Sequence, residues 1–431
     1  MTIALPTEPD GEQYEDLVVA GLQALGYFVE TQLKLREGKK EVLELDVVAT
    51  PSGGAPEDRI LFEVKKERFS FTNIFKLFGQ RTYLRIPRAG LVSLHGGDPD
   101  HLPVYVSKGD ELGVGVCHLQ ADIMALQRLA PAQNALGEAE HAAITAAAWY
   151  QQIARRIALA DLLMECRSRR GTAALDHART YLFNMRASFF QPEPLVRAEA
   201  LYSAYLATPK LSAEAVALVM AERKLKEKVV WTKVRDSHEL LWIQAIVDTE
   251  ANGRLSIVKN GLDDFLLRGA LPAPTTTLKV GNLTLKVPLH ALPESFHRGL
   301  EALREHSHSR RLPYLFQAFY TLLGGFLFFQ DEQELAMMES LTGIPAAELV
   351  NTLRLLDHFF APADSTFFFT AKNNLLCLKM VPGFVRGGGA FLRRMLFKIE
   401  NYEDRYPIMG WLIARWHNAL YHSLEPYLKK S

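Results

Sequence analysis

Two acidic residues and a lysine near the start of the chain have the types and the spacing of a metal-assisted hydrolytic site. Asp46 lies in the apolar run 42–48, and Glu63 and Lys65 follow after the turn-rich segment 51–58. Successive side chains of a strand alternate between its two faces, so Glu63 and Lys65 share one face. If the two strands pair across the turn, Asp46 lies beside Glu63, and the two carboxylates repel each other unless a cation compensates them.

A divalent metal ion is the cation that suits such a pair. Mg²⁺ is usually held by one or two carboxylates together with waters and substrate phosphate oxygens, and it can polarise a phosphate and activate a water. Lys65 would orient that water or neutralise charge that develops on the phosphate. The residues therefore predict Mg²⁺ or Mn²⁺ bound by Asp46 and Glu63. The alternative is an ordinary salt-bridged face of an edge strand.

Hydrophobic periodicity in the first 119 residues predicts the elements that would position this site. The expected helices are 11–25 and 72–85, and the expected strands are 27–33, 42–49, 59–66, 90–94 and 114–119. The order is helix, three strands, helix, strand, connection and strand. This order favours one central sheet with helices packed on it, an α/β domain.

The arrangement resembles the PD-(D/E)xK nuclease superfamily, and most closely its restriction-endonuclease-like, Mrr-type members. Asp46, Glu63 and Lys65 match the D…ExK pattern. The segment 11–15 (GEQYE) is similar to the G-x-x-[FY]-E opening of the first family helix, and Gln80 lies where many members place a glutamine on the helix after ExK. The match covers about residues 11–118, roughly a quarter of the chain, and Leu45 replaces the proline that often precedes the aspartate.

The resemblance implies a restriction-endonuclease-like fold and a metal-dependent endonuclease that hydrolyses DNA in prokaryotic restriction, anti-phage defence or repair, with defence favoured for a large fused architecture. It implies catalytic roles for Asp46, Glu63 and Lys65, with support from Gln80 and Glu15. An inward-facing Glu15 shares a helix stripe with Val18, whereas the alternative for Glu15 is a helix-start acid stabilised by the dipole. The alternative for Gln80 is a plain exposed helix residue.

The rest of the chain divides by its pattern into a helical region, a hairpin with a connector, and a C-terminal region. The order helix, helix, glycine-bearing turn, helix and hairpin at 314–380 is that of a winged helix-turn-helix. The expected boundaries are 1–120, 121–270, 271–310 and 311–431. The expected helices are 144–165, 173–188, 194–207, 213–226, 237–249, 314–329, 332–340, 345–359 and a last one within 400–428; the hairpins are 275–288 and 366–380.

Charge does not by itself indicate a nucleic-acid-binding protein. The whole chain has 49 lysine and arginine residues against 49 aspartate and glutamate residues, so DNA binding would depend on local basic patches. Residues 1–120 carry 13 basic residues against 18 acidic ones, so help is expected from elsewhere. The candidate nucleic-acid contacts are Arg223, Lys224, Lys226, Lys372, Arg386, Arg393 and Arg394. For Arg223, Lys224 and Lys226, the alternative is an ordinary helix whose basic side chains are solvated.

Several other classes of protein are disfavoured. Three widely spaced cysteines indicate neither a zinc site nor a disulfide scaffold. The start of the chain has no signal-peptide pattern, and no apolar run reaches the length of a membrane span, so a cytoplasmic location without membrane association is expected. No P-loop is present, which suggests a separate regulatory or ATPase partner. A homodimer would supply two cutting sites, and RNA stays open as a substrate. The alternative function is a winged-helix nucleic-acid-binding regulator or assembly subunit whose nuclease-like domain is not catalytic.

Overall fold

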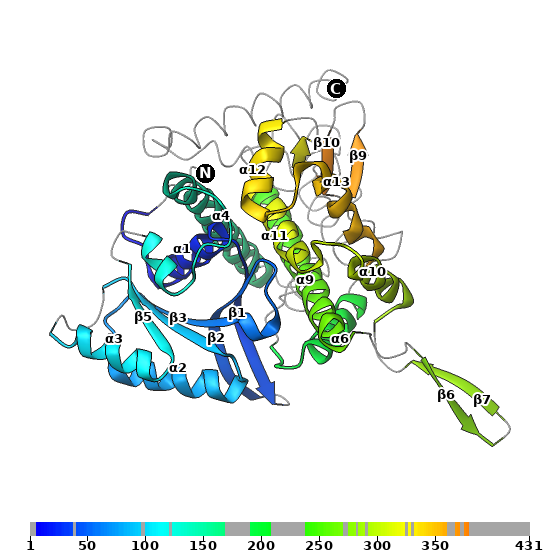
Figure 1. Ribbon diagram of the computed structural model, residues 1–431, viewed down its shortest axis with the longest axis horizontal. Coiled ribbons are helices and arrows are strands. Elements are labelled where there is room, and N and C mark those ends of the chain that lie inside the picture. The colour runs from blue at the N-terminus through cyan, green and yellow to red at the C-terminus, as the bar shows by residue number, and fades with distance from the viewer. Residues whose placement is uncertain are drawn as a thin grey trace.

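The computed structural model of the protein describes residues 6–37, 40–95, 100–119, 123–168, 190–207, 238–269, 275–281, 283–288, 292–323, 326–328, 332–359, 367–370 and 375–378. Its N-terminal part is a mixed α/β unit with a five-stranded sheet, and helices follow it (Figure 1). The predicted order of an α/β region followed by a mostly helical region is therefore confirmed.

The central sheet has the strand order β1-β2-β3-β4-β5. The pairs β1–β2 and β2–β3 are antiparallel, whereas the pairs β3–β4 and β4–β5 are parallel. Their bounds are β1 (Tyr27–Glu37), β2 (Lys40–Pro51), β3 (Ile60–Lys65), β4 (Arg88–Ser93) and β5 (Val114–His118). All five predicted strands are present, and the first two extend beyond their predicted ends.

Helix α1 (Gly11–Ala24) begins at a capping box and is followed by a glycine turn. The Asp10 side chain accepts a hydrogen bond from Gln13 N at 2.8 Å, and the Gln13 side chain accepts one from Asp10 N at 3.0 Å. Gly26 has a φ of +92°, which lets the chain turn directly into β1. The helix predicted for 11–25 is therefore confirmed.

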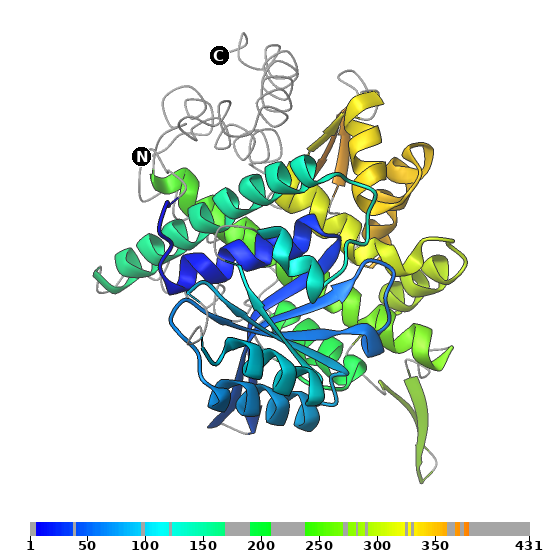
Figure 2. The ribbon, with the colours of Figure 1, turned by 60° about the vertical axis from the view of Figure 1, so that its left-hand side comes forward.

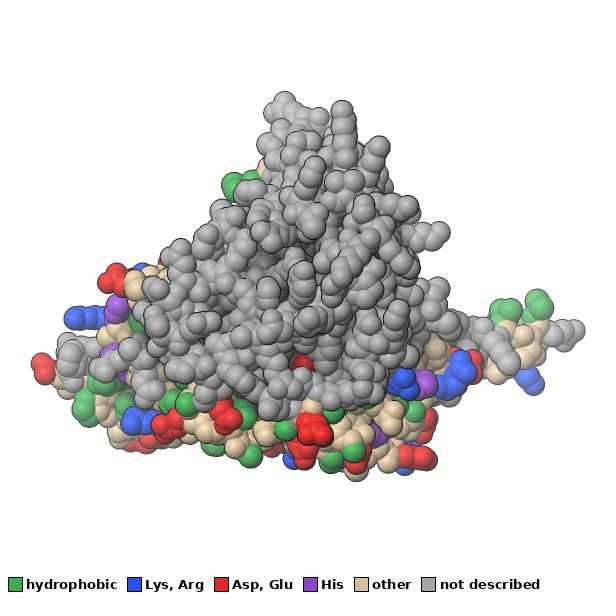
Figure 3. Space-filling model, turned by 90° about the horizontal axis from the view of Figure 1, so that it is seen from above, with side chains coloured by type: hydrophobic (Ala, Val, Ile, Leu, Met, Phe, Trp, Pro, Cys, Tyr) green, Lys and Arg blue, Asp and Glu red, His purple; other side chains and the backbone are tan. Residues whose placement is uncertain are grey.

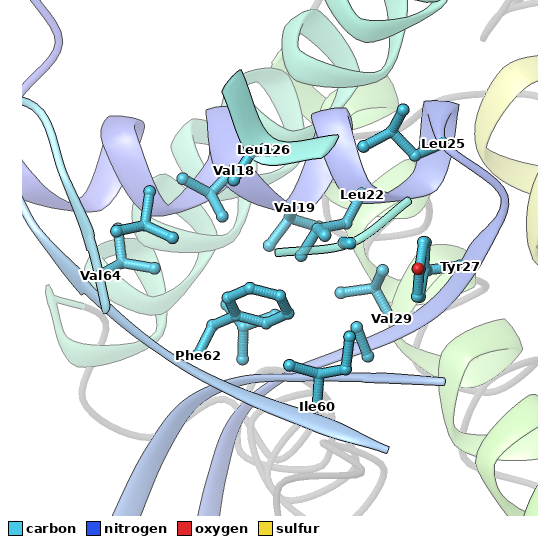
Figure 4. Close-up of a cluster of buried hydrophobic side chains, with 14 of the residues drawn as sticks. Val18, Val19, Leu22, Leu25, Tyr27, Val29, Ile60, Phe62, Val64 and Leu126 are labelled. Carbon is cyan, nitrogen blue, oxygen red and sulfur yellow. The ribbon is translucent and has the colours of Figure 1, made fainter. Parts of the chain in front are cut away.

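The sheet is covered on both faces (Figure 2). Under α1, Val18 and Leu22 belong to a buried cluster with Phe62 and Val64 of β3 (Figure 4). The opposite face packs against the helices α2 (Phe71–Leu84) and α3 (Leu102–Glu111). The predicted helix 72–85 corresponds to α2, but α3 occupies what the sequence predicted as a plain connection.

Helix α4 (Glu138–Ser168) lies along α1 and joins the helical part of the chain to the α/β unit (Figure 2). The indole Nε1 of Trp149 donates a hydrogen bond to Gln13 O at 2.8 Å. Arg156 forms an ion pair with Asp16 at 2.8 Å. The predicted helix 144–165 is present and longer than expected.

Two further helices, α6 (Pro194–Ala207) and α9 (His238–Arg268), pack against each other, and α9 also packs against α4. The prediction for α6 is confirmed. The prediction 237–249 for α9 is too short, because the helix continues to Arg268. Arg197 of α6 pairs with Glu30 of β1 at 2.8 Å, and the two side chains are 1% and 9% exposed.

The predicted hairpin at 275–288 is confirmed as β6 (Thr275–Val280) and β7 (Leu283–Pro288), with Gly281 at a φ of +64°. It projects from the body of the molecule (Figure 1). Its exposed apolar side chains include Val280, Leu283 and Leu285 (Figure 3).

The C-terminal described part combines four helices with a small antiparallel sheet of order β8-β10-β9. The elements are α10 (Glu294–Arg304), α11 (Leu312–Leu323), β8 (Phe326–Phe328), α12 (Glu332–Thr342), α13 (Ala346–Arg354), β9 (Phe367–Thr370) and β10 (Leu375–Leu378). This part also has two short 3₁₀ helices, η3 (Ser309–Arg311) and η4 (Leu355–His358). Two others lie nearer the N-terminus, η1 (Pro56–Asp58) and η2 (Ile123–Arg128).

The single helix predicted for 314–329 is wrong in its second half. Helix α11 ends at Leu323, and β8 follows instead. The sequence continues after Leu323 with two glycines, which disfavour helix in that position. The predicted helices 173–188 and 213–226 and the last helix within 400–428 lie outside the described residues. No helix in the described part of the chain combines the length and the apolar character that crossing a membrane requires.

Gln317 of α11 covers the outer edge of β1. Its side chain accepts a hydrogen bond from Val29 N and donates one to Val29 O, both at 2.8 Å. Tyr314 of the same helix donates from its hydroxyl to Gln23 O at 2.7 Å. Because β1 is the first strand of the sheet, these buried bonds satisfy backbone groups that would otherwise be unpaired.

Candidate active site

Asp46 and Glu63 lie where two neighbouring strands separate. The strands β2 and β3 pair as far as Val47 and Phe62, and the next position on each strand holds one of the two carboxylates. Asp46 Oδ2 accepts a hydrogen bond from Val64 N at 2.9 Å. The carboxylate takes the place of a backbone acceptor, so it is fixed at the gap between the strands.

The Glu63 carboxylate is 2% exposed and is paired with two lysines. Its Oε1 lies 2.8 Å from Nζ of Lys65 on the same strand and 2.8 Å from Nζ of Lys76 on α2. The structure thus places Glu63 and Lys65 on one face, as their spacing predicted. Lys76 was missed in the sequence. Its position four residues before Gln80 puts both on one side of the helix, which is the signal that could have found it.

Gln80 is buried and joins α2 to β2. Its Nε2 donates to Glu44 O at 3.5 Å, a long hydrogen bond. The alternative of a plain exposed helix residue is therefore wrong. The Glu44 carboxylate itself is exposed and forms an ion pair with Lys34 at 3.4 Å, so Gln80 contacts the strand backbone beside Asp46 and not a second acid.

Glu15 approaches the site from α1, on the other side of the gap. It is partly buried, and it lies close enough to Asp46 to feel its charge. Burial and the neighbouring Asp46 charge raise the pKa of Glu15 to about 7, although Arg156 and a hydrogen bond from the Gln32 side chain oppose the rise. The structure therefore brings Glu15 to the site instead of leaving it as an exposed helix-start acid.

The pKa values describe an excess of negative charge. Burial and the charge of Glu63 raise the pKa of Asp46 to about 6. Burial would also raise the pKa of Glu63, but hydrogen bonds from Lys65 and Lys76 lower it below its ordinary value. Burial opposes the Lys65 ammonium, and its bond with Glu63 outweighs that effect and raises its pKa. Two lysines therefore compensate Glu63 and leave Asp46 short of positive charge.

A divalent metal ion fits this donor set by charge and by chemistry. Mg²⁺ commonly takes one or two protein carboxylates and completes its shell with water and substrate phosphate, and Asp46 and Glu63 supply two. Among the described residues, no group of three or more His, Cys, Asp or Glu side chains forms a metal site by itself.

The predicted nucleic-acid contacts lie outside the described residues. These are Arg223, Lys224, Lys226, Lys372, Arg386, Arg393 and Arg394.

Comparisons of the chain with models of protein families, with curated proteins and with solved structures find no match. The functional argument consequently depends on the geometry and the electrostatics of the site.

Proposed function

We propose that the protein is a metal-dependent endonuclease that hydrolyses phosphodiester bonds of DNA. The observation that carries the proposal is the separation of β2 from β3 at Asp46, which holds that carboxylate beside the Glu63–Lys65 ion pair. The opening ends the β2–β3 backbone pairing at Val47 and Phe62 and places two like charges near each other, which repel. A site that must admit a phosphate needs such an opening.

Asp46 and Glu63 would hold Mg²⁺ or Mn²⁺, which supplies a Lewis acid for the scissile phosphate and lowers the pKa of a bound water. Lys65 is placed by its bond to Glu63 so that its ammonium can donate to the attacking water or to a phosphate oxygen. As water attacks phosphorus it gives up one proton to solvent, the bond from phosphorus to the leaving oxygen breaks, and that oxygen takes up a proton from solvent. Gln80 fixes α2 against β2, and Glu15 borders Asp46 from the opposite side.

The C-terminal part is proposed as a substrate-binding or partner-binding unit. The order α11, β8, α12, α13, β9 and β10, with a three-stranded antiparallel sheet, supports a winged-helix architecture. The N-terminal order of elements supports a restriction-endonuclease-like fold, with prokaryotic restriction or anti-phage defence as the proposed role. The same proposal includes two further parts. An ATPase or sensor partner would control cleavage, and a homodimer would cleave both strands.

The test is cleavage by the purified full chain on plasmid, single-stranded DNA and RNA, with Mn²⁺ or with EDTA. We expect Mn²⁺-dependent DNA cleavage that Lys65→Ala reduces by about 100-fold or more. The matched control is Lys108→Ala, because Lys108 is exposed on α3 and pairs with Glu111 at 2.8 Å. Wild-type rates in the Lys65→Ala variant, or cleavage that persists in EDTA, would refute the catalytic assignment.

A second candidate is a nucleic-acid-binding regulator or assembly subunit with a non-catalytic nuclease-like domain. The double pairing of Glu63 with Lys65 and Lys76 favours it, because those ion pairs neutralise the acid within the protein. Two results together would favour this second function. The protein would bind DNA without cleaving it in Mn²⁺, and wild type and Asp46→Asn would show no difference in Mn²⁺ affinity. Repeating the assay with co-purified partner proteins separates it from a nuclease that needs a trigger.

A further inference from the structure

Gln32 has an unusual backbone conformation in the middle of β1. Its φ is +52°, and among the described residues other than glycine, Arg85 is the other one with a positive φ. Side chains with a Cβ are disfavoured in this left-handed region, which glycine and asparagine tolerate best. A glutamine that keeps this conformation within a strand is therefore held there by its surroundings, and such residues concentrate at functional sites.

The conformation of Gln32 coincides with a change of face along β1. Val29 belongs to the buried cluster under α1, whereas Leu33 belongs to the cluster under α2 and α3. Residues an even number of positions apart in a regular strand would share one face. The strand thus turns over at Gln32, and the side chains on either side of it serve different cores.

Gln32 of β1 lies opposite Asp46 of β2 in the sheet. In the β1–β2 register Thr31 pairs with Val47 and Leu33 pairs with Leu45, so the positions between them, Gln32 and Asp46, face each other across an interruption. In the register of the described strands, Asp46 therefore has no ladder partner on β1 or on β3, and its carboxylate, not its backbone, bonds to β3. The left-handed residue and the candidate metal-binding carboxylate are two sides of one local feature.

From this position the side chain of Gln32 lies near Glu15 on α1 and acts to lower the pKa of that carboxyl. The charged groups that act on Glu15 include Asp46, Arg156, Asp16 and Lys65. The Arg156 guanidinium pairs with Asp16 at 2.8 Å and with Glu12 at 3.0 Å. Arg156 is thus directed toward the start of α1, and the amide of Gln32 is a neutral donor on the strand side of Glu15.

We propose that Gln32 is a positioning residue of the site: its left-handed backbone directs the amide at Glu15 and fixes that carboxyl beside Asp46. The inference rests on the proposed nuclease function and deepens it, because it assigns the strained backbone and a residue outside the D…ExK pattern to the same reaction. Glycine would form the same turn with less strain, so the amide is the group of Gln32 that a glycine variant would remove.

The experiment compares Gln32→Gly with Gln32→Asn and uses Arg85→Gly as the matched control. Arg85 has a φ of +55° and is exposed at the C-terminal end of α2. Both glycine variants relieve a left-handed residue, so both should unfold at a temperature no lower than that of the wild type. The readouts are the melting temperature, the single-turnover rate of DNA cleavage and the affinity for Mn²⁺ measured by titration.

We expect Gln32→Gly to keep or raise the melting temperature while cleavage falls on the order of 10-fold to 100-fold and Mn²⁺ affinity falls with it. Gln32→Asn, which keeps an amide and tolerates the backbone, should recover part of the loss. Arg85→Gly should leave cleavage and Mn²⁺ affinity unchanged. In a Glu15→Gln background, Gln32→Gly should add little to the loss, because the two residues act as one unit.

Two results would overturn the inference. If the wild type cleaves DNA and Gln32→Gly cleaves and binds Mn²⁺ equally well, Gln32 has no positioning role, and the proposed nuclease function stands. If Gln32→Gly loses cleavage together with a large fall in melting temperature and Gln32→Asn restores neither, the role of Gln32 is structural. Absence of both cleavage and Mn²⁺ binding in the wild type would instead remove the proposed function itself, and the inference with it.

Discussion

Asp46 and Glu63 flank one gap between strands, yet their pKa values shift in opposite directions. Burial acts on both carboxylates. Glu63 receives hydrogen bonds from Lys65 and Lys76 that outweigh burial, whereas Asp46 receives one from Val64 N and feels the charge of Glu63. Asp46 is therefore the acid that the folded protein holds at a cost, which is typical of functional carboxylates.

We expect Asp46→Asn to stabilise the metal-free protein at about pH 7 and to have little effect near pH 4. The pKa of Asp46 rises from 3.8 to about 6 on folding, so the folded state binds this proton more tightly. The stabilisation is complete below about pH 4 and is lost as the pH rises through about 6. Asparagine avoids that loss, which amounts to a gain on the order of 3 kcal/mol.

Thermal unfolding in EDTA between about pH 4 and pH 7 measures this difference. Asp110→Asn, at an exposed carboxylate on α3, is the control and should follow the wild type. Parallel stability curves for wild type and Asp46→Asn across this range would contradict the assignment of Asp46 as an acid that is costly to ionise.

The sequence predicts the residues of the site that follow from strand alternation and helix spacing. Asp46, Glu63 and Lys65 could be found because strand periodicity places them. The role of Gln32 could not, because its type carries no signal for a left-handed backbone in a strand. Only the packing of both neighbouring cores reveals the turn-over of β1, and that packing depends on residues far away in the chain.

At the scale of elements, α1 is the helix that carries Glu15 into the site, and its capping box determines where it starts. We expect Asp10→Ala to lower the free energy of unfolding by about 1 kcal/mol, because Gln13 N loses its acceptor. Asp10→Asn, which keeps an acceptor, should lose less. Chemical denaturation of the two variants measures the effect, and equal stability of Asp10→Ala and wild type would show that the cap is dispensable.

Elements with strong periodicity were predicted well, and elements completed by distant partners were not. Gly109 argues against a helix at α3, but a Cβ there would lie 2.4 Å from Val114 O, so close packing on β5 requires glycine. In α9, the polar residues of its second half, such as Asn260, Asp263 and Asp264, suggest from sequence alone that the helix ends before them. In the fold they are buried and paired, as with Asp263 and Arg59 of the sheet region at 3.0 Å.

At the scale of the whole molecule, buried ion pairs join the α/β unit to the helical region. Glu30 of β1 accepts from Arg197 of α6 and from Ser256 Oγ of α9. Burial would raise the pKa of Glu30, and the Arg197 guanidinium outweighs it and lowers that pKa. Glu30 and Arg197 are separated by 167 positions in sequence, a distance over which a local pattern predicts no pairing.

We expect Arg197→Met to lower the free energy of unfolding by about 3–5 kcal/mol, because it leaves a buried carboxylate without its partner. The double variant Glu30→Met with Arg197→Met should recover most of the loss, since it removes both charges. Urea denaturation of the two variants checks this expectation. A double variant as unstable as the single one would show that packing, and not charge, joins the two regions.

Gln317 has a consequence for how the N-terminal unit could be used elsewhere. A fragment that stopped near residue 120 would lack α11, so Val29 would lose both of its buried hydrogen bonds to that helix. The outermost strand of the fragment would then expose unpaired backbone groups, which could pair with the same strand of another fragment. Transplanting the N-terminal unit into a different protein would therefore call for a new cover along β1, because in this chain the cover is supplied from almost 300 residues downstream.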